Sequence, residues 1–470
     1  MLSHYGTVFT AGNRESAGVA LEKIFKAYDI RGRVPEELDE ATAFRIGWAF
    51  TTYLGAQRIV VGGDVRDSSP RLLRAAALGM EAAGAKVSSI GLCGTEEIYF
   101  ATFHYEFDGG MMITASHNPI GWNGMKLVGD NARPLSGDEG LAEVRALCAQ
   151  APQPDFTREP SLVALSHREA LVQHLLGYVD IDKLKPLKLV ANPGNGAAGP
   201  LMDALSARLP FEIVRVNYAP DASFPNGIPN PLLPENRAAT AEAVRASGAD
   251  FGIAWDGDFD RCFLFDERGE FIEGYYMVGL LAEAMLKQHP GSKIVCEPRL
   301  TWNTIEMVER AGGECVQTKA GHAFIKATMR SANAVYGGEM SAHHYFRDFA
   351  YCDSGMVPWL LIAGLVSESG KPLSALVAER IAAYPCSGEI NRTVKDADRI
   401  IAATEAHYAA DAKSVSHLDG LSMEFDGWRF NLRKSNTEPL LRLNVESRGN
   451  RELVEARVRD LLALIEEADA

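Results

Sequence analysis

From about residue 25 onward the chain alternates strand-like and helix-like segments, and this alternation restricts the folds that it can adopt. The pattern runs through three rounds. Helices are expected at residues 41–54, 70–84, 200–209, 235–247, 276–287, 302–310 and 323–330, and strands at 59–61, 86–90, 187–191, 212–216, 251–255, 294–295 and 334–336. Strands that alternate with helices predict α/β units around largely parallel sheets.

The last part of the chain has a different pattern. A helix is expected at residues 396–410, strands near 421–425, 428–432 and 440–445, and a long helix from Leu453. This order predicts an α+β unit distinct from the three before it. Composition changes at residues 149–165, which are rich in proline and polar side chains, and again at 385–390. We expect an N-terminal extension at residues 1–23 and domains at 24–163, 164–273, 274–388 and 389–470.

Charge and composition exclude some classes of function. A net charge of −15 argues against general binding to nucleic acids or anionic membranes, because both need a basic surface. The seven cysteines are scattered and show no zinc-ligand spacing, which indicates buried thiols in a reducing compartment. The N-terminus lacks the basic start and apolar core of a secretory signal. The apolar run at residues 356–366 is too short to cross a bilayer, so we expect a cytoplasmic protein.

A serine follows one of the expected buried strands. Residues 111–113 predict the end of this strand, and the polar turn after it presents the hydroxyl of Ser116 close in sequence to His117, Asn118 and Lys126. A serine at such a junction is held by a rigid scaffold and remains accessible. This placement suits a hydroxyl that carries and transfers a group. The alternative is an Asx-Pro turn whose serine only bonds the local backbone.

Three carboxylates lie close together between two apolar strands. Asp256, Asp258 and Asp260 alternate along the chain, so in an extended segment they project to one side. Like charges this close repel each other unless a cation lies among them. Oxygen ligands favour Mg²⁺ or Ca²⁺, and Arg261 offsets part of the charge. An EF-hand is excluded because Arg261 occupies its glycine position. A solvated acidic hairpin is the other interpretation.

Two further stretches carry polar side chains suited to a sugar phosphate. Residues 433–437 combine a cation, hydroxyls and an amide between two strands, which are donors that surround a phosphate dianion, although a hairpin turn is the alternative. Glu339 and Ser341 face the same way in an extended chain and could bind vicinal sugar hydroxyls. An ordinary edge strand is the alternative here. A lysine and His322 lie in the nearby stretch 318–322.

These stretches, taken together and in this order, resemble the α-D-phosphohexomutase superfamily. The sequence TASHNP at residues 114–119 followed by NGMK at 123–126, DGDFDR at 256–261, GEMS at 338–341 and RKSNTEP at 433–439 carry the resemblance, with KAYDIRG at 26–32. The similarity is greatest to the bacterial phosphomannomutase/phosphoglucomutase branch. It implies four domains around a central cleft, three of them similar α/β domains and the last an α+β domain like the TATA-binding protein.

The resemblance also implies roles for individual residues. Ser116 is the implied phosphoserine, and its phosphate joins Asp256, Asp258 and Asp260 in holding Mg²⁺. The groups implied to surround the transferring phosphoryl or the sugar are Tyr28, Arg31, His117, Lys126, Arg261, His322, Glu339, Ser341 and His343. The groups implied to grip the second phosphate are Arg433, Ser435, Asn436 and Thr437. Arg299 replaces a lysine that some relatives carry in the cleft, which keeps the charge but changes the hydrogen-bond geometry.

The implied reaction moves phosphate between C1 and C6 of a hexose through a 1,6-bisphosphate. The expected substrates are glucose and mannose 1- and 6-phosphates, with Mg²⁺ as cofactor and glucose 1,6-bisphosphate as activator or intermediate. Lys126 or His343 is the candidate general base. Glucose and mannose differ only at C2, so a site that binds O3 and O4 and does not contact C2 would accept both sugars. The alternatives are a phosphoglucosamine mutase, a metal-dependent sugar phosphatase and a sugar-phosphate-binding protein. We expect a monomer or homodimer.

Overall fold

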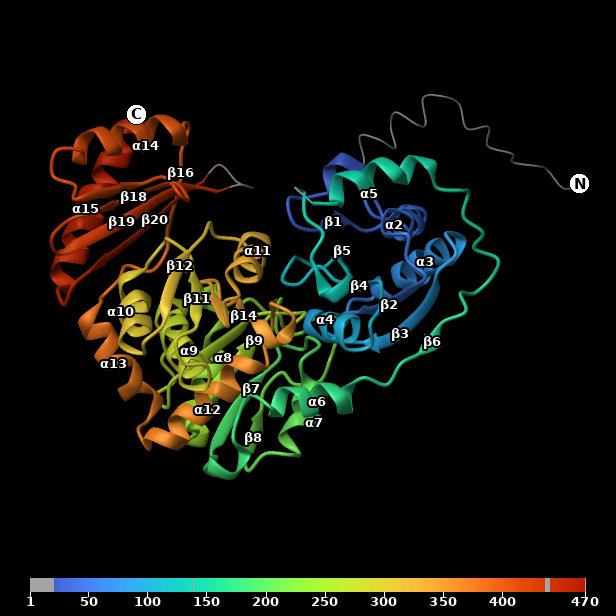
Figure 1. Cartoon of the computed structure of the whole chain (residues 1–470), viewed down its shortest axis with the longest axis horizontal. Helices are drawn as coiled ribbons and strands as arrows, with labels where there is room; N and C mark the ends of the chain where they lie inside the picture. Colours follow the sequence, from blue (N-terminus) through green and yellow to red (C-terminus); the bar gives the residue numbers. More distant parts are fainter. Residues whose placement is uncertain (1–20, 138, 436–439, 470) are drawn as a thin grey trace, which may run out of the picture.

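The computed structural model describes residues 21–137, 139–435 and 440–469 (Figure 1). Asn436 and Thr437, and most of the extension expected at residues 1–23, lie outside the described residues. Four sheets follow one another along the chain, and we number the units built on them domains 1 to 4. In Figure 1, domain 1 (blue) and domain 4 (red) lie at opposite ends, with domains 2 and 3 between them.

Domain 1 contains a six-stranded sheet in the order β1-β5-β4-β2-β3-β6. Its strands are β1 Ile30–Arg33, β2 Arg58–Gly63, β3 Lys86–Leu92, β4 Gly109–Ile113, β5 Trp122–Gly129 and β6 Val163–Ala164, with helices α2 Glu40–Leu54, α3 Ser69–Ala82, α4 Thr95–His104 and α5 Leu141–Leu147. Strands β4, β2, β3 and β6 run parallel, while β5 pairs antiparallel with both β4 and β1.

Alternation along β2 and β4 places helices on both faces of this sheet. Val61 and Met111 belong to the core that contains α2 and α3 residues, whereas Val60 and Met112 belong to the core that contains α4 residues. Successive strand residues point to opposite faces, so a strand buried on both sides is apolar at nearly every position. The site loop that follows β4 therefore starts from a strand fixed from two directions.

Domains 2 and 3 repeat the α/β pattern with mixed sheets. Domain 2 has the order β10-β9-β7-β8, and domain 3 has β12-β11-β13-β14-β15. The domain 2 elements are α6 Arg168–Leu176, β7 Lys188–Asn192, α7 Gly199–Ser206, β8 Glu212–Arg215, α8 Ala238–Ser247, β9 Phe251–Trp255 and β10 Cys262–Phe265. The domain 3 elements are α9 Gly274–Gln288, β11 Lys293–Cys296, α10 Trp302–Arg310, β12 Glu314–Gln317, α11 His322–Ala332, β13 Tyr336–Gly338, β14 His344–Phe346, β15 Cys352–Asp353, α12 Val357–Ser369 and α13 Leu373–Ala383.

Domain 4 is an α+β unit, as expected from the C-terminal pattern. Its sheet, in the order β16-β20-β19-β18-β17, is antiparallel throughout, and its helices are α14 and α15. The bounds are β16 Ile390–Thr393, α14 Ala397–Tyr408, β17 Ser414–Ser416, β18 Leu421–Glu424, β19 Trp428–Lys434, β20 Leu440–Ser447 and α15 Arg451–Asp469.

The four domains are joined in two ways. One apolar core contains residues of α4, β9, α9 and α12, so domains 1, 2 and 3 share it. Domain 4 has its own core. A buried polar junction connects domain 4 to domain 3: Arg429 donates to the carbonyls of Pro298 and Arg299 at 2.8 and 3.2 Å, and Glu446 accepts from Thr301 N at 2.8 Å. Domain 4 is thus anchored beside Arg299.

The expected helices and strands are recovered with small shifts at their ends. The strand expected at 334–336 begins at Tyr336, and Asn333, the C-cap of α11, has a left-handed conformation. The sheets are less parallel than expected, since domains 1 and 3 add antiparallel strands at one edge and domain 2 adds β10. Among the described residues, no single helix has the length and apolar character to cross a membrane; only α12 and α13 together meet that test, as a pair bent by 96°.

Candidate active site

Ser116 lies in the loop that follows β4. Its backbone has φ +48°, a left-handed conformation that is rare outside glycine, and the residue is buried. The hydroxyl of Thr114 accepts a hydrogen bond from Ser116 N at 2.8 Å. Such backbone strain persists only where surrounding contacts over-determine it, and it concentrates at functional sites. The loop therefore presents the Ser116 hydroxyl in one imposed direction.

Arg66 supplies most of these restraining contacts. Its two terminal nitrogens donate to four carbonyls of the loop: Ser116 at 2.9 Å, Asn118 at 2.6 Å, and Pro119 and Trp122 at 3.0 Å each. The side chain is buried beside Asp64, 3.4 Å from its carboxylate. A planar guanidinium can serve several acceptors at fixed angles. Sequence analysis missed Arg66, because nothing near it in sequence indicates a loop some fifty residues away.

The three acidic residues follow β9 in a tight turn. The sequence analysis assumed that residues 256–261 are extended, and this was wrong. Phe259 N donates to Asp256 O at 3.2 Å, and Phe259 has φ +44°. The turn approaches the serine loop so closely that a Cβ at Gly257 would lie 2.6 Å from Ser116 O. The carboxylates converge because of this turn rather than through strand alternation.

Hydrogen bonds and ion pairs connect the acids to domain 1. Ser116 Oγ donates to Asp256 Oδ2 at 2.8 Å, and Thr95 Oγ1 donates to Asp258 Oδ2 at 2.6 Å. Lys126 Nζ lies 2.8 Å from Asp258 Oδ2 and also pairs with Asp260. Arg261 Nε donates to Asp256 Oδ2 at 2.8 Å. The site is thus assembled across the boundary between domains 1 and 2.

Neighbouring polar and charged groups lower the pKa of two of these acids, Asp256 and Asp258. Burial raises the pKa of Asp256, but Arg261 and His117 outweigh it and lower this pKa to about 2. The pKa of Asp258 is also lowered: burial and Asp260 raise it, and Lys126 more than compensates. Burial lowers the pKa of Lys126, yet Asp258 and Asp260 raise it above its ordinary value. Lys126 is therefore a cation at neutral pH.

The acids fit a hard divalent cation. Asp256, Asp258 and Asp260 each have one buried Oδ1 atom without a hydrogen-bond partner in the described part of the chain. One oxygen from each lies within 4.8 Å of the others. Buried carboxylate oxygens are costly unless a proton donor or a metal satisfies them. Oxygen donors alone are the ligand set of Mg²⁺ or Ca²⁺.

His117 lies between the serine and Arg261. Its Nδ1 is 3.0 Å from Ser116 Oγ, and Arg261 also contacts this ring nitrogen. Burial and the positive charge of Arg261 lower the pKa of His117. The imidazole is therefore neutral at pH 7 and offers a polar, uncharged neighbour to the hydroxyl.

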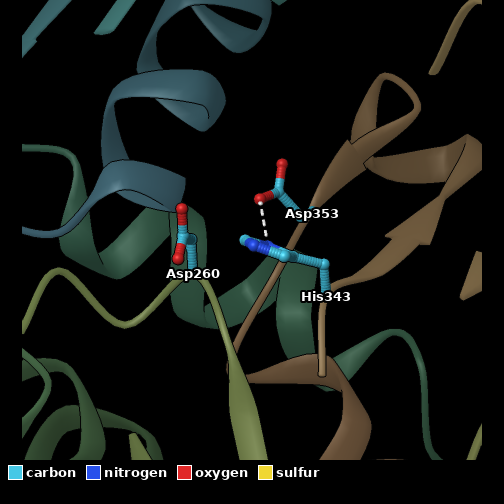
Figure 2. Close-up of side chains that lie close together, drawn as sticks. All are labelled: Asp260, His343 and Asp353. Atoms are coloured by element: carbon cyan, nitrogen blue, oxygen red, sulfur yellow. Dashed lines mark hydrogen bonds and ion pairs between the residues drawn. The ribbon is translucent and has the colours of Figure 1, made fainter. Parts of the chain in front are cut away.

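His343 lies between two carboxylates, those of Asp260 and Asp353 (Figure 2). Its Nδ1 is 3.1 Å from Asp353 Oδ2, and the ring reaches toward Asp260. Asp353 is buried and also pairs with Lys326 at 2.6 Å. Burial lowers the pKa of His343, but Asp260 and Asp353 raise it above its ordinary value. The bond to Asp353 fixes the ring orientation. Neither Asp353 nor Lys326 was anticipated from the sequence.

Two residues of the N-terminal motif also contribute to the site. Arg31 donates to Ala115 O at 2.8 Å and contacts Asn118, so it is a second arginine that supports the serine loop. Tyr28 meets His322 edge-on, with ring centroids 4.9 Å apart. This contact joins domain 1 to domain 3 across the site.

The expected sugar-binding pair lies in a hairpin turn, not in an extended chain. Ala342 N donates to Glu339 O at 3.1 Å, and Ala342 has φ +70°, so the assumption that Glu339 and Ser341 face one way along a strand was wrong. Glu339 accepts from Gly321 N at 2.9 Å and from the Tyr345 hydroxyl. In this conformation its carboxylate is already engaged within domain 3.

Domain 4 contributes a cluster of arginines. Arg433, at the end of β19, lies opposite Arg442 of β20, and both pair with Glu389, as does Arg299 of domain 3. Arg442 Nη2 is 3.4 Å from Ser435 Oγ. Neither Arg442 nor Glu389 was anticipated from the sequence, because each lies outside the RKSNTEP stretch.

One cavity of about 880 Å³ connects most of these groups. Among its lining residues are Tyr28, Arg31, Ser116, His117, Lys126, Asp260, Arg261, His322, His343 and Arg442. Asp256 and Asp258 lie buried directly beneath Ser116 and Lys126. Arg299, Glu339, Ser341, Arg433 and Ser435 do not line this cavity. All four domains nevertheless reach it.

Comparison with known proteins matches all four domains to one family. The phosphoglucomutase/phosphomannomutase alpha/beta/alpha domains I, II and III match residues 22–153, 169–269 and 273–384, and the C-terminal domain of that family matches residues 389–464. A phosphomannomutase of Salmonella typhimurium is 59% identical over 448 residues, which are 94% of this chain and 98% of the relative.

Two further relatives agree. Phosphohexose mutases of Xanthomonas campestris pv. campestris are 59% identical over 443 residues, with 94% of this chain and 98% of the relative covered. The crystal structure of a phosphoglucomutase/phosphomannomutase family protein from Burkholderia thailandensis superposes with a TM-score of 0.84 at 31% identity, covering 96% of this chain and 99% of that one. The chain therefore belongs to the phosphoglucomutase/phosphomannomutase family.

Proposed function

We propose that this protein is a phosphomannomutase/phosphoglucomutase that moves phosphate reversibly between C1 and C6 of glucose and mannose phosphates. Phosphorylated Ser116 gives its phosphoryl group to the free hydroxyl of a hexose 1-phosphate, and a 1,6-bisphosphate forms. This intermediate turns over in the cleft and returns its other phosphate to Ser116. Glucose 1,6-bisphosphate is then both intermediate and activator. We also place the enzyme in the cytoplasm, since its seven cysteines are free thiols.

A single observation carries the proposal. The Ser116 hydroxyl is 2.8 Å from a carboxylate whose second oxygen, like those of Asp258 and Asp260, is buried without a partner in the described residues. This is a hydroxyl placed against a cation site at the floor of a cavity large enough for a sugar phosphate. A structural serine in an Asx-Pro turn has no need of such surroundings.

Phosphoryl transfer depends mainly on positioning and on positive charge near the oxygens of the moving group. Asp256, Asp258 and Asp260 are the residues that would hold Mg²⁺, which when bound offsets charge on the phosphate oxygens. Lys126 and Arg261 contribute fixed positive charge at the same place. Arg31 and Arg66 hold the Ser116 backbone in line with the cavity.

The acceptor hydroxyl must lose a proton, and we assign this role to His343. Its Nδ1 is held by Asp353, which leaves Nε2 available to the cavity. Lys126 is the weaker candidate, because the ordinary pKa of a lysine already lies far above neutral pH and two carboxylates raise it further. His343→Ala should lower kcat by about 100-fold or more, the usual contribution of a general base.

The second phosphate is bound by domain 4 in this proposal. Arg433, Ser435, Asn436 and Thr437 must accept the C1 or the C6 phosphate in turn, so they should recognise phosphate and little of the sugar. Glu339 and Ser341 are proposed to reach O3 and O4 of the sugar when domain 4 closes. These contacts do not involve C2. Dual specificity for glucose and mannose follows from this arrangement.

The nearest alternatives share the same site. A phosphoglucosamine mutase would prefer the 2-amino sugar, and a metal-dependent phosphatase would use an aspartate as nucleophile and leave Ser116 unmodified. A coupled assay on glucose, mannose and glucosamine 1-phosphates, with and without glucose 1,6-bisphosphate, separates them. We expect comparable turnover of glucose and mannose and stimulation by the bisphosphate. A preference between these two sugars beyond about 100-fold contradicts dual specificity.

A further inference from the structure

Three guanidinium groups from two domains converge on one carboxylate, that of Glu389. This residue precedes β16, in the segment that enters domain 4. Arg299 Nη1 lies 3.0 Å from Glu389 Oε2 and Arg433 Nη2 lies 3.5 Å from the same oxygen, while Arg442 Nη1 lies 3.2 Å from Oε1. The side chain of Glu389 is 22% exposed, so these pairs are only partly screened by water.

Glu389 is the acceptor that all three arginines share. Glu297 holds Arg299 from the other side. Without Glu389 the three guanidinium groups would lose this shared acceptor, and a phosphate dianion offers oxygens in its place. Arg433 also has a buried Nε without an acceptor among the described residues. The cluster is therefore built for an anion in addition to Glu389, or in its place.

The arginines of this cluster repel one another. Burial and the neighbouring Arg299 both lower the pKa of Arg433. Burial raises the pKa of Glu389, but the three arginines together lower it below its ordinary value. Glu389 thus offsets the repulsion among these three cations.

We propose that Glu389 is an internal counter-ion that occupies the phosphate-binding arginines and competes with the sugar's non-reacting phosphate. This inference rests on the proposed function, because it assigns the cluster to that phosphate. It adds Arg442 to the phosphate site and makes Glu389 a positioning residue that weakens phosphate binding. The 1,6-bisphosphate must dissociate from this site, reorient and bind again, so a higher affinity in the ground state does not raise kcat.

The competition can be measured without turnover. The probe is inorganic phosphate, titrated calorimetrically into the full-length enzyme with Ser116 phosphorylated, so that the other anion site is filled. Glu389→Gln should bind phosphate about tenfold more tightly than the wild type, because a like charge beside the ligand is removed. In the coupled assay the same variant should show a lower KM and also a lower kcat. A merely structural role would not lower KM.

Two controls keep the result interpretable. Asp398→Asn makes the same charge change in domain 4, on a residue that pairs with Lys434 at 2.8 Å and not with the arginines, and should leave phosphate affinity unchanged. Glu389→Asp keeps the charge but shortens its reach, so it should give intermediate tightening, and it decides the matter if the glutamine variant does not fold. Arg442→Gln should weaken phosphate binding.

The outcomes separate this inference from the proposed function. Equal or weaker phosphate binding by Glu389→Gln, in an enzyme whose wild type binds phosphate and turns over hexose phosphates, overturns the competing role of Glu389 alone. A wild type that neither binds phosphate nor interconverts the sugar phosphates overturns both.

Discussion

Arg66 fixes the serine loop, so replacing it should lower both the stability and the activity of the protein. Arg66 donates four hydrogen bonds to loop carbonyls at 2.6–3.0 Å, from a buried position. Lysine keeps the charge but loses the planar fork, so Arg66→Lys can serve about two of these carbonyls. Each lost bond to a charged donor costs about 1.5 kcal/mol or more, so the variant should lose about 3 kcal/mol of unfolding free energy.

The same change should lower activity more than the loss of stability alone explains. Ser116 keeps its left-handed backbone only while its surroundings enforce it, and a shift of about 1 Å in a reacting group costs about 100-fold in rate. The measurements are urea unfolding followed by tryptophan fluorescence, and kcat at a temperature where the variant is folded. Intact mass then shows whether less Ser116 is phosphorylated.

Arg71→Lys is the matched control for this experiment. Arg71 lies five positions further on, in α3, and makes one exposed ion pair with Glu40 at 2.7 Å. A surface pair of this kind is worth under about 1 kcal/mol. The reasoning is refuted if Arg66→Lys unfolds within about 0.5 kcal/mol of the wild type and keeps at least half of its kcat, since surface changes already span that range.

Three further predictions concern other parts of the site. Asp258→Asn should lower Mg²⁺ affinity by about 100-fold in calorimetric titration, and unchanged affinity would remove this residue from the cation site. Asp353→Asn should lower the pKa of His343 in an NMR titration of the metal-free protein, because one of two carboxylates that raise it is lost. A raised folded pKa contributes stability that is lost as the pH rises from the ordinary histidine pKa of about 6.5 through the raised one, so the wild type should weaken over that range and the variant should weaken less. Glu446→Gln removes the buried partner of Arg429 and should destabilise the protein by about 3–5 kcal/mol in urea, whereas a change under about 1 kcal/mol would show that this pair does not anchor domain 4.

The sequence was most informative where a functional residue follows a buried strand. Ser116 comes after β4 and Asp256 after β9, and apolar strands of this kind are recognisable from composition alone. Both residues then lie at the strand ends that meet at the cavity. Four domains and their classes could be predicted for the same reason, while the limits of those domains stay predictions.

The sequence was least informative where a contact depends on a turn. Glu339 and Ser341 were expected on one face of an extended segment, but Ala342 adopts a left-handed conformation and closes a hairpin. Arg66, Asp353 and Glu389 act through partners far away in the sequence, so no local spacing reveals them. Helix α12 was not assigned because it is buried on nearly every side and lacks the apolar periodicity of a surface helix.

The most direct test of the whole account follows the phosphoryl group itself. Enzyme carrying a radioactive phosphate on Ser116 is mixed with unlabelled mannose 1-phosphate and quenched at intervals. The label should leave Ser116, pass through mannose 1,6-bisphosphate and appear in mannose 6-phosphate, and Ser116→Ala should neither take up label nor turn over. Label released as inorganic phosphate, or a Ser116→Ala enzyme that still interconverts the two phosphates, would contradict the account.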